Sequence, residues 1–210
     1  MAAWRAYTNK NNSIIVDLFH GQLGSTFTCL KCGKTSATYS SFSHLSLPLP
    51  TTKTRRPVPL LCCIEEFLQK EKLTDHWRCP ICKAHKGAEK QLTIYQLPLI
   101  LITQLKRLTS ENGQPVRLSK KVEIPIKLDL TTYVHSPHGP TSERSQRFIY
   151  DLYAICDHQG DWRSGHYTAS VRSLHRPGWN GFNDREVAPL AELETQNEIL
   201  VRQIHDSCFM

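Results

Sequence analysis

The sequence predicts an α+β protein that is built on an antiparallel sheet and braced by a metal ion. Two short C-x-x-C pairs lie far apart in the chain, segments with β-type alternation fill most of its second half, and one stretch has clear helical periodicity. Because most of a subdomain separates the two pairs, a shared metal would tie two distant hairpins together. We therefore expect long β hairpins that reach to the metal, beside a central sheet.

The candidate metal ligands are the four cysteines of the two pairs, Cys29, Cys32, Cys79 and Cys82. Four thiolates suit one tetrahedral zinc in a closed structural site that has no open position for chemistry. Gly33 follows the second sulfur of the first pair and permits the tight turn that such a pair needs. His85 stands three residues after the last cysteine and is an alternative ligand, although both pairs are complete without it.

The first half of the chain predicts short strands, an irregular connection and one helix. Residues 13–19 form an apolar run that is typical of a strand or a short buried segment. Residues 23–29 and 35–49 have β-type composition on either side of the first cysteine pair. Several prolines then indicate an extended connection, and apolar residues recur at helical spacing over residues 59–70, which predicts an amphipathic helix.

The second half of the chain predicts mostly strands. The expected strand segments are residues 90–97, 99–102, 122–130, 148–155, 167–171 and 179–182. Residues 133–146 are rich in Pro, Ser, His and Gly and are expected to form a mobile loop. From residue 190 onward apolar residues recur at helical spacing, so residues 191–210 are predicted to form a helical tail.

Composition limits the classes of partner. The net charge is +7, but basic residues are scattered, and the densest cluster, Lys53 to Arg56, has no aromatic neighbours. A solvated loop fits that cluster better than a nucleic-acid surface, so no nucleic acid is expected, and a protein with an acidic face suits the charge. A zinc-ribbon nucleic-acid binder remains the alternative, which salt-dependent binding to duplex DNA would favour.

The cysteines and apolar runs also indicate the compartment. No run of about 18 apolar residues occurs, so no membrane partner is expected, and residues 1–10 do not resemble a secretory signal. Half of the eight cysteines stand in metal spacing, which makes a disulfide framework the second choice. Cys62, Cys63 and Cys156 are expected to be small buried apolar residues. A reducing cytoplasmic or nuclear compartment follows.

The candidate catalytic residues lie on two late strands. His166 opens a strand directly after Gly165, and Tyr167 follows it, so the ring can face a cleft. Asn183 and Asp184 come on the next strand, where an amide or carboxylate could orient the imidazole, as the third member of a cysteine-protease triad does. An Asn-Asp pair is also typical of a turn, and a single histidine near a turn is usually only solvated.

The order of these motifs resembles the ubiquitin-specific protease family, peptidase family C19. The matching segments are the two cysteine pairs, Leu105–Arg107, Asp151–Ala154, Ser164–Ala169 and Trp179–Asp184. The resemblance runs from about residue 14 to residue 190. It implies a papain-like cysteine protease fold that lacks its helical thumb, with zinc-braced fingers at about 23–95, a palm at about 96–190, and a divergent tail beyond.

The resemblance also implies a role for each site residue. His166 matches the general base, Asn183 the residue that orients it, and Asp184 an assisting acid. Gly165 and Tyr167 match residues that line the channel for the ubiquitin C-terminal glycines. The four cysteines of the pairs match ligands of a structural zinc. The implied function is thiol-dependent hydrolysis of the bond after the ubiquitin C-terminal glycine, with ubiquitin and ubiquitinated proteins as partners.

One departure from the family bears on activity. The family's nucleophile lies in a box of the type Gly-Asn-Thr-Cys-Tyr, and no such box occurs in the printed sequence. Without a thiolate, His166 has nothing to activate, so we expect this chain alone to be inactive. The alternative is a non-catalytic ubiquitin-binding or scaffold protein derived from such an enzyme. The reading frame upstream of Met1 would distinguish the two.

Overall fold

The computed structural model describes residues 2–51, 56–74, 77–135, 147–160, 163–173, 178–190 and 204–209. The chain divides into two compact units. The first unit comprises Met1–Ser43, Phe67–Leu99 and Asp129–Phe148, and the second comprises His44–Glu66, Ile100–Leu128 and Ile149–Met210. The segment expected to form the fingers, residues 23–95, therefore contributes to both units.

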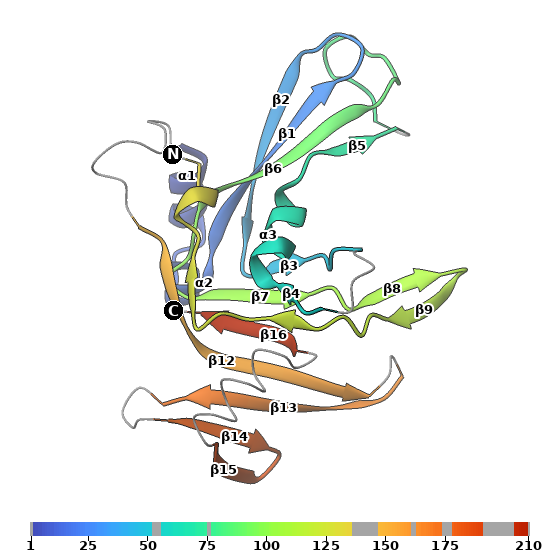
Figure 1. The fold of residues 1–210 in the computed structure, drawn as a ribbon. Coiled ribbons are helices and arrows are strands. Elements are labelled where there is room, and N and C mark those ends of the chain that lie inside the picture. Colours follow the sequence, from blue (N-terminus) through green and yellow to red (C-terminus); the bar gives the residue numbers. More distant parts are fainter. Residues whose placement is uncertain are drawn as a thin grey trace. The chain divides into compact units, whose positions relative to one another are not determined.

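A four-stranded antiparallel sheet dominates the first unit, and we call it the fingers sheet (Figure 1). Its strands are β1 (Gly21–Cys29), β2 (Thr35–Phe42), β5 (Glu71–Leu73) and β6 (Ala88–Gln96), in the order β2-β1-β6-β5. Cys29 at the end of β1 is paired with Ala88 at the start of β6. This register brings the turn after β1 and the segment before β6, which contain the two cysteine pairs, to the same end of the sheet.

Two short helices precede β1, and one of them corrects the expectation for residues 13–19. Helix α1 spans Ala2–Lys10 and α2 spans Ile14–Phe19. The side-chain oxygen of Ser13 accepts a hydrogen bond from the backbone N–H of Val16, so the apolar run begins with an N-cap and forms a helix. Only Val16 of this helix is buried. A Ser directly before an apolar run is a sequence signal for the start of a helix, and it could have predicted α2.

An eight-stranded sheet forms most of the second unit, and we call it the palm sheet. Its strands are β3 (Leu45–Leu47), β7 (Leu101–Leu105), β11 (Lys127–Asp129), β12 (Ile149–Gly160), β13 (Gly165–Arg172), β14 (Trp179–Asn183), β15 (Glu186–Leu190) and β16 (Ile204–Phe209). The order is β15-β14-β13-β12-β16-β7-β3, with β11 paired to β12. The pair β3–β7 is parallel, and the pairs that join β15, β14, β13, β12, β16 and β7 are antiparallel.

The prediction of a helical tail is wrong for residues 204–209. These residues form β16, which lies between β12 and β7 in the palm sheet. Pairing on both sides satisfies the backbone of this strand, and this long-range effect overrides the local helical spacing. The remaining tail residues, 191–203 and 210, lie outside the described residues, as do residues 136–146 of the expected loop.

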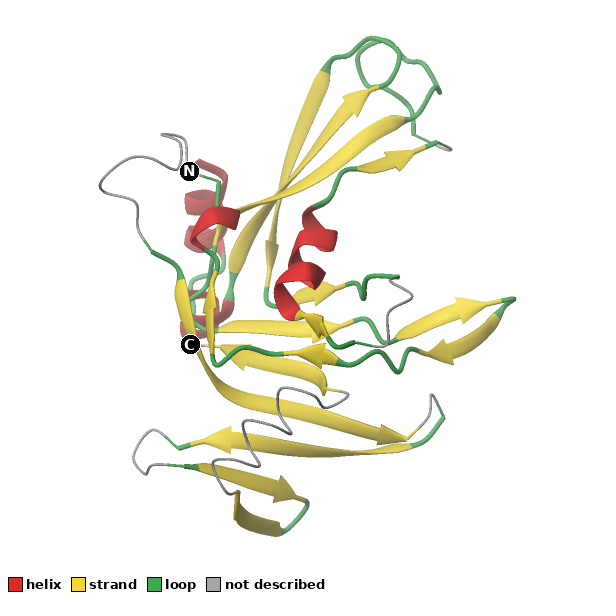
Figure 2. Cartoon of the chain, viewed as in Figure 1, coloured by secondary structure: helices red, strands yellow, loops and turns green. Residues whose placement is uncertain are grey.

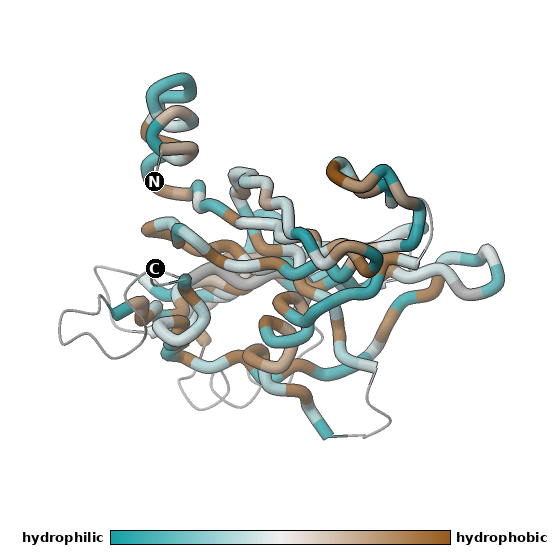
Figure 3. Tube along the Cα trace, turned by 90° about the horizontal axis from the view of Figure 1, so that it is seen from above, coloured by the Kyte–Doolittle hydropathy of each residue, from teal (hydrophilic) through white to brown (hydrophobic). Residues whose placement is uncertain are grey.

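The core of the second unit contains the expected helix and alternating strands. Helix α3 spans Leu60–Leu68, and it buries Leu60, Cys63 and Ile64. Strand β7 alternates between fully and partly buried residues. Figure 3 shows the corresponding mixture of hydrophobic and hydrophilic residues along the trace. Strands predominate over helices in the described chain (Figure 2), and no described helix is long and apolar enough to cross a membrane.

Short elements complete the chain. Val58–Pro59 (β4) pairs in parallel with Val122–Glu123 (β10), Leu108–Glu111 (β8) forms a hairpin with Gln114–Arg117 (β9), and Thr131–Tyr133 forms a 3-10 helix, η1. The single strand expected over residues 122–130 is therefore two short strands, β10 and β11. Arg107 is fully buried beside the β8–β9 hairpin, where its Nη1 donates to the carbonyls of Leu118 and Lys120.

Candidate functional site

The two cysteine pairs have the same local geometry. In the first pair the N–H of Gly33 donates to the carbonyl of Cys29 at 2.9 Å, and in the second pair the N–H of Lys83 donates to Cys79 at 3.0 Å. Both donors have positive φ, 68° at Gly33 and 58° at Lys83. The tight turn expected at Gly33 is confirmed. The second pair builds the same turn with a residue other than glycine.

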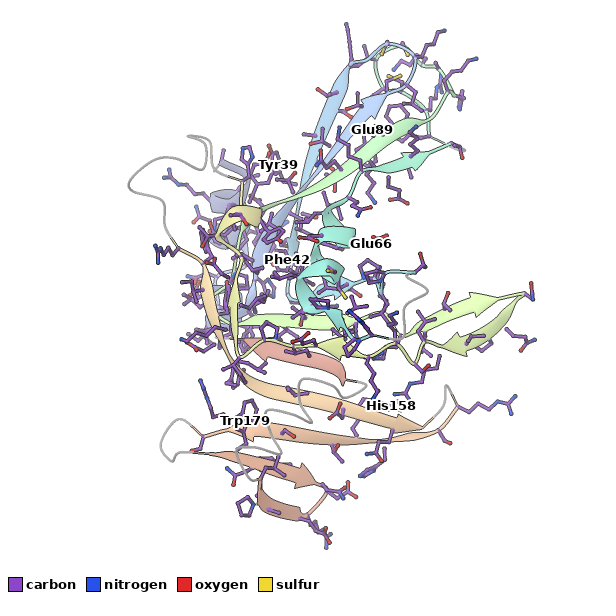
Figure 4. All side chains as sticks on the ribbon, viewed as in Figure 1. Tyr39, Phe42, Glu66, Glu89, His158 and Trp179 are labelled. Carbon is purple, nitrogen blue, oxygen red and sulfur yellow. The ribbon has the colours of Figure 1, made fainter. Side chains whose placement is uncertain are left out.

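The four sulfur atoms form one cluster with the dimensions of a zinc site. All four lie within 4.8 Å of one another, and the sulfur of Cys29 is 3.8 Å from that of Cys82. The sulfurs of Cys32 and Cys79 are 3.9 Å apart. A tetrahedron with Zn–S bonds of about 2.3 Å has edges of about 3.8 Å, so the separations fit. The sulfur atoms gather at the far end of the fingers sheet in Figure 4. His85 is not part of the cluster.

Backbone groups favour the thiolate form of two of these cysteines. The N–H of Cys82 donates to the sulfur of Cys79 at 3.4 Å. This hydrogen bond, followed by one from Ile81, lowers the pKa of the Cys79 thiol to about 6. The pKa of Cys29 is also lowered, by a backbone hydrogen bond from Cys32 and then one from Lys31. The pKa of Cys32 is instead raised to about 11, because a backbone hydrogen bond from Lys34, which lowers it, is outweighed by desolvation and by the neighbouring cysteines. The hydrogen bonds therefore favour the thiolate, the form that a metal binds, at Cys29 and Cys79 but not at Cys32.

The palm sheet brings His166 and Asn183 together through its register. Strand β13 pairs with β14 so that Ala169 lies opposite Phe182. If the same register continues for one more residue, Thr168 lies opposite Asn183. Side chains alternate along a strand, so His166 and Thr168 share a face, and Asn183 lies on that face as well. The Asn-Asp pair is also a turn, as the sequence indicated, because Asp184 has a φ of 51° at the connection from β14 to β15.

The hydrogen bond between the two residues fixes where the imidazole carries its proton. Nε2 of His166 lies 2.5 Å from Oδ1 of Asn183. An amide oxygen can only accept, so Nε2 of the neutral ring is the protonated nitrogen and Nδ1 has the free lone pair. Oδ2 of Asp184 lies farther from Nε2, at 3.9 Å, and this carboxylate is 79% exposed. Asn183 is therefore the direct partner, and Asp184 adds a weak, solvent-screened attraction only to the protonated ring.

The neighbours of His166 in the sequence are placed differently from it. By strand alternation, Tyr167 faces the opposite side of the sheet, where its ring packs on that of His158 with centroids 4.7 Å apart. A Cβ atom on Gly165 would overlap the imidazole of His158. The glycine is therefore required by close packing at the start of the strand. Tyr167 remains 56% exposed.

Two residues near His166 were missed by sequence reasoning. His158 is half-buried on β12 and packs against the strand of His166 (Figure 4). Arg117 from the β8–β9 hairpin donates hydrogen bonds to the carbonyls of His158 and Gly160. Neither residue has a sequence motif. Only the pairing of His158 with Tyr167 in adjacent strands could have indicated the first of them.

The other cysteines of the palm sheet do not lie beside His166. Cys156 is opposite Ala169, so its side chain is on the other face, and it is three residues, or about 10 Å, along the strand. Cys208 is paired with Ala154, five residues from the strand partner of His166. Cys63 is fully buried in α3, and burial raises the pKa of its thiol to about 11. Its burial, expected from the sequence, is confirmed, whereas Cys62 and Cys156 are only half-buried.

The antiparallel architecture and the four-cysteine cluster define a class of protein. They match the catalytic domains of ubiquitin-specific proteases among solved structures. A structure of the yeast SAGA DUB module aligns over 98% of this chain and 44% of the solved one, with a TM-score of 0.78 and 29% identity. The SAGA DUB module bound to ubiquitin aldehyde aligns over 100% of this chain and 48% of the solved one, with a TM-score of 0.77 and 27% identity.

Sequence comparison gives the particular family. The family model described as "Ubiquitin carboxyl-terminal hydrolase" matches residues 1–203, and the chain belongs to this family. "Ubiquitin carboxyl-terminal hydrolase 4" of Vanderwaltozyma polyspora is 38% identical over 200 residues, covering 89% of this chain and 22% of that protein. "Ubiquitin carboxyl-terminal hydrolase 2" of Gallus gallus is 35% identical over 191 residues, covering 90% of this chain and 51% of that protein. The chain thus spans a fifth to a half of these relatives.

Proposed function

We propose that this chain contributes the histidine–asparagine half of a thiol-protease site that hydrolyses the bond after the ubiquitin C-terminal glycine. The hydrogen bond from Nε2 of His166 to Oδ1 of Asn183 is the observation that supports this most directly. It leaves Nδ1 as a base, on a side chain that is 48% exposed and therefore accessible to a substrate. Membership of the deubiquitinase family supplies the substrate class.

In the proposed reaction the imidazole acts first as a base and then as an acid. Nδ1 of His166 takes the proton of a cysteine thiol, and the thiolate attacks the carbonyl carbon of the terminal glycine. The imidazolium then gives this proton to the leaving lysine amine, which leaves a thioester for water to hydrolyse. Asn183 accepts the hydrogen bond from Nε2 in both protonation states and so holds the ring in one orientation throughout. Gly165 and Tyr167, which flank the histidine, are the proposed contacts for the ubiquitin tail through their backbone, because the ring of Tyr167 faces the other side of the sheet.

The thiol in this reaction does not come from a cysteine near His166 among the described residues. Cys156 faces away, and Cys63 is buried with a raised pKa that keeps it protonated at neutral pH. We therefore propose that the printed chain binds ubiquitin but does not hydrolyse its conjugates. In a longer protein that has a box of the Gly-Asn-Thr-Cys-Tyr type, the same histidine would complete the site.

We propose that the four-cysteine cluster holds one zinc ion in a structural role. The sulfur separations fit tetrahedral zinc, and four thiolates leave no coordination position for a substrate. The ion would join the turn after β1 to the segment before β6. We propose that the fingers sheet, fixed in this way, contacts the body of ubiquitin. A solved neighbour, the SAGA DUB module, has been determined with ubiquitin aldehyde bound.

An alternative function is a non-catalytic ubiquitin-binding or scaffold module. The position of Cys156 on the face opposite His166 favours it, because none of the cysteine side chains that the structure describes in this sheet then faces the pair. The reading frame upstream of Met1 separates the two functions. A Cys box there favours the hydrolase. A genuine start at Met1 favours the binding module.

A ubiquitin substrate with a fluorogenic C-terminal amide tests the proposal. The chain is expected to bind ubiquitin and to release no fluorophore. A version extended by a Cys box is expected to release it, and His166→Ala in that version is expected to abolish turnover without weakening binding. Turnover by the printed chain that an alkylating agent removes would contradict the assignment of a missing thiol. Absence of ubiquitin binding would contradict the substrate class.

The compartment and the wider partners are also proposals. No cysteine whose side chain the structure describes is in a disulfide, which suits a reducing cytoplasm or nucleus. Ubiquitinated proteins are the proposed wider partners. The basic cluster at residues 53–56 lies mostly outside the described residues, and we propose no nucleic-acid or membrane partner. Fractionation of cells that express the tagged chain tests the compartment.

A further inference from the structure

We propose that Arg117 is a positioning residue for His166, holding the strand that carries it from a separate hairpin. The proposal rests on the proposed function of His166. Arg117 is the last residue of β9, and its guanidinium forms two hydrogen bonds to the end of β12, from Nη1 to the carbonyl of Gly160 and from Nη2 to the carbonyl of His158. A planar fork with two donors fixes orientation as well as distance.

The palm sheet is narrow at the level of His166. Among the residues that the structure describes, β16 pairs with β12 as far as Asp157, and the paired residues of β13 and β14 begin at Ala169. Gln159 and His166 are paired in the two-stranded end of the β12–β13 hairpin, beyond both neighbouring strands. A two-stranded ribbon is only marginally stable on its own. Within the described part of the chain, a contact from outside these two strands therefore adds support to the backbone under the histidine.

Arg117 supplies this support at the two residues that bracket the strand partner of the histidine. His158 and Gly160 flank Gln159, and carbonyls two residues apart point to the same side of a strand. The carbonyls of His158 and Gly160 follow the last residue of β12 that is paired with described residues of β16, and one guanidinium provides hydrogen bonds to both. In this way the β8–β9 hairpin takes the place of a neighbouring strand at the end of β12.

The same two residues contact the strand that carries the histidine. The ring of His158 packs on Tyr167 and occupies the space beside Gly165 that a Cβ atom would need. Gly160 is paired with Gly165 and has a φ of 125°, a conformation that L side chains rarely adopt. Arg117 therefore binds the carbonyls of β12, and β12 in turn contacts the residues on either side of His166.

Nuclear magnetic resonance of the intact chain tests the proposal without requiring turnover. The nitrogen shifts of the His166 ring, at a pH where the ring is neutral, report which nitrogen is protonated. Arg117→Ala is expected to change the Nε2-protonated ring to a mixture of tautomers. It is also expected to increase amide exchange at Gln159 and His166 by about tenfold or more, the effect of losing a charge-assisted hydrogen bond.

Matched variants separate positioning from a general loss of stability. Lys121→Ala removes the same charge from an exposed residue of the same segment and is expected to change neither signal. Arg117→Lys keeps the charge but not the fork, and an intermediate mixture of tautomers is expected. If Arg117→Ala does not fold, the lysine variant is compared instead. Unchanged ring shifts and unchanged exchange in the variant that folds would overturn the proposal.

The outcome is distinguishable from a failure of the proposed function. If the chain binds no ubiquitin while Arg117→Ala still mixes the tautomers of His166, the function is wrong and the positioning role stands. If ubiquitin binds and the ring signals of His166 do not change in Arg117→Ala, the positioning role is wrong and the function stands. Asn183→Ala serves as the reference, because it removes the partner of Nε2 directly and leaves both hydrogen bonds of Arg117 in place.

Discussion

At the scale of single residues, the position of one proton defines what the histidine can do. Asn183 accepts from Nε2 of His166, so Nδ1 is the basic nitrogen. From the sequence, His166 and Asn183 were expected on adjacent strands, but the sequence could not show which ring nitrogen of His166 faces the amide of Asn183. That choice depends on the register between β13 and β14, which is a long-range property of the sheet.

Asn183→Ala is expected to release the ring of His166 from its single tautomer, because the only direct acceptor of Nε2 is then removed from the described site. Asp184→Asn is expected to have little effect, since its carboxylate is 3.9 Å away and mostly exposed. The imidazole nitrogen shifts measure both. If only the Asp184 variant lost the tautomer preference, Asp184 and not Asn183 would be the direct partner of the ring, and the assignment would be contradicted.

Cys63 should resist alkylation at neutral pH. Burial raises the pKa of its thiol to about 11, above the ordinary 9.0, and the side chain is fully buried. The reactive thiolate is therefore scarce below pH 9 and increases about tenfold per pH unit up to the pKa. Mass-spectrometric mapping after brief treatment with iodoacetamide at pH 7 should find Cys62 labelled before Cys63. Equal labelling of both in the folded chain would contradict the burial.

At the scale of elements, the structure agrees best with the sequence where the signal is local. The amphipathic helix expected at 59–70 is α3, and the turn expected at Gly33 is present. The strands expected at residues 148–155, 167–171 and 179–182 are β12, β13 and β14. The failures have long-range causes or a missed cap. Ser13 begins a helix where a strand or a short buried segment was expected, and β16 is a strand because it fits between β12 and β7.

The two cysteine turns offer a matched pair of backbone variants. Gly33→Ala should lower the free energy of unfolding by about 1 kcal/mol, because an L side chain is strained at positive φ. No atom crowds this position, so the cost comes from the backbone alone. Lys83→Gly should leave stability equal or slightly higher, since it removes that strain from the second turn. Chemical denaturation of zinc-loaded protein measures both, and the same sign for both changes would contradict the shared geometry.

At the scale of the whole molecule, the family follows from the order of motifs more than from any one residue. Each motif alone has an ordinary structural explanation, but the order of the motifs along the chain resembles that in ubiquitin-specific proteases. The family match over residues 1–203 confirms this resemblance. The sequence could not reveal the contribution of Arg117. Its contacts with Gly160 and His158 join segments more than 40 residues apart without any motif.

Zinc should be a stoichiometric part of the folded chain. Elemental analysis of purified protein is expected to give about one zinc per chain, and removal by a chelator should lower the unfolding temperature. Cys79→Ser should reduce both the zinc content and the unfolding temperature, since it removes one of four clustered ligands. Cys62→Ser is the control and should keep its zinc. Zinc-free protein with unchanged stability would show that the cluster is not a metal site.

The central claim is that His166 and Asn183 form half of a site for the ubiquitin tail. The most direct measurement is a titration of isotope-labelled chain with ubiquitin, in which the ring signals of His166 and the side-chain amide of Asn183 are followed. Intact ubiquitin is expected to shift both signals, and ubiquitin without its last two glycines should bind more weakly and leave them in place. Binding of both forms of ubiquitin with no change at either residue would contradict the account.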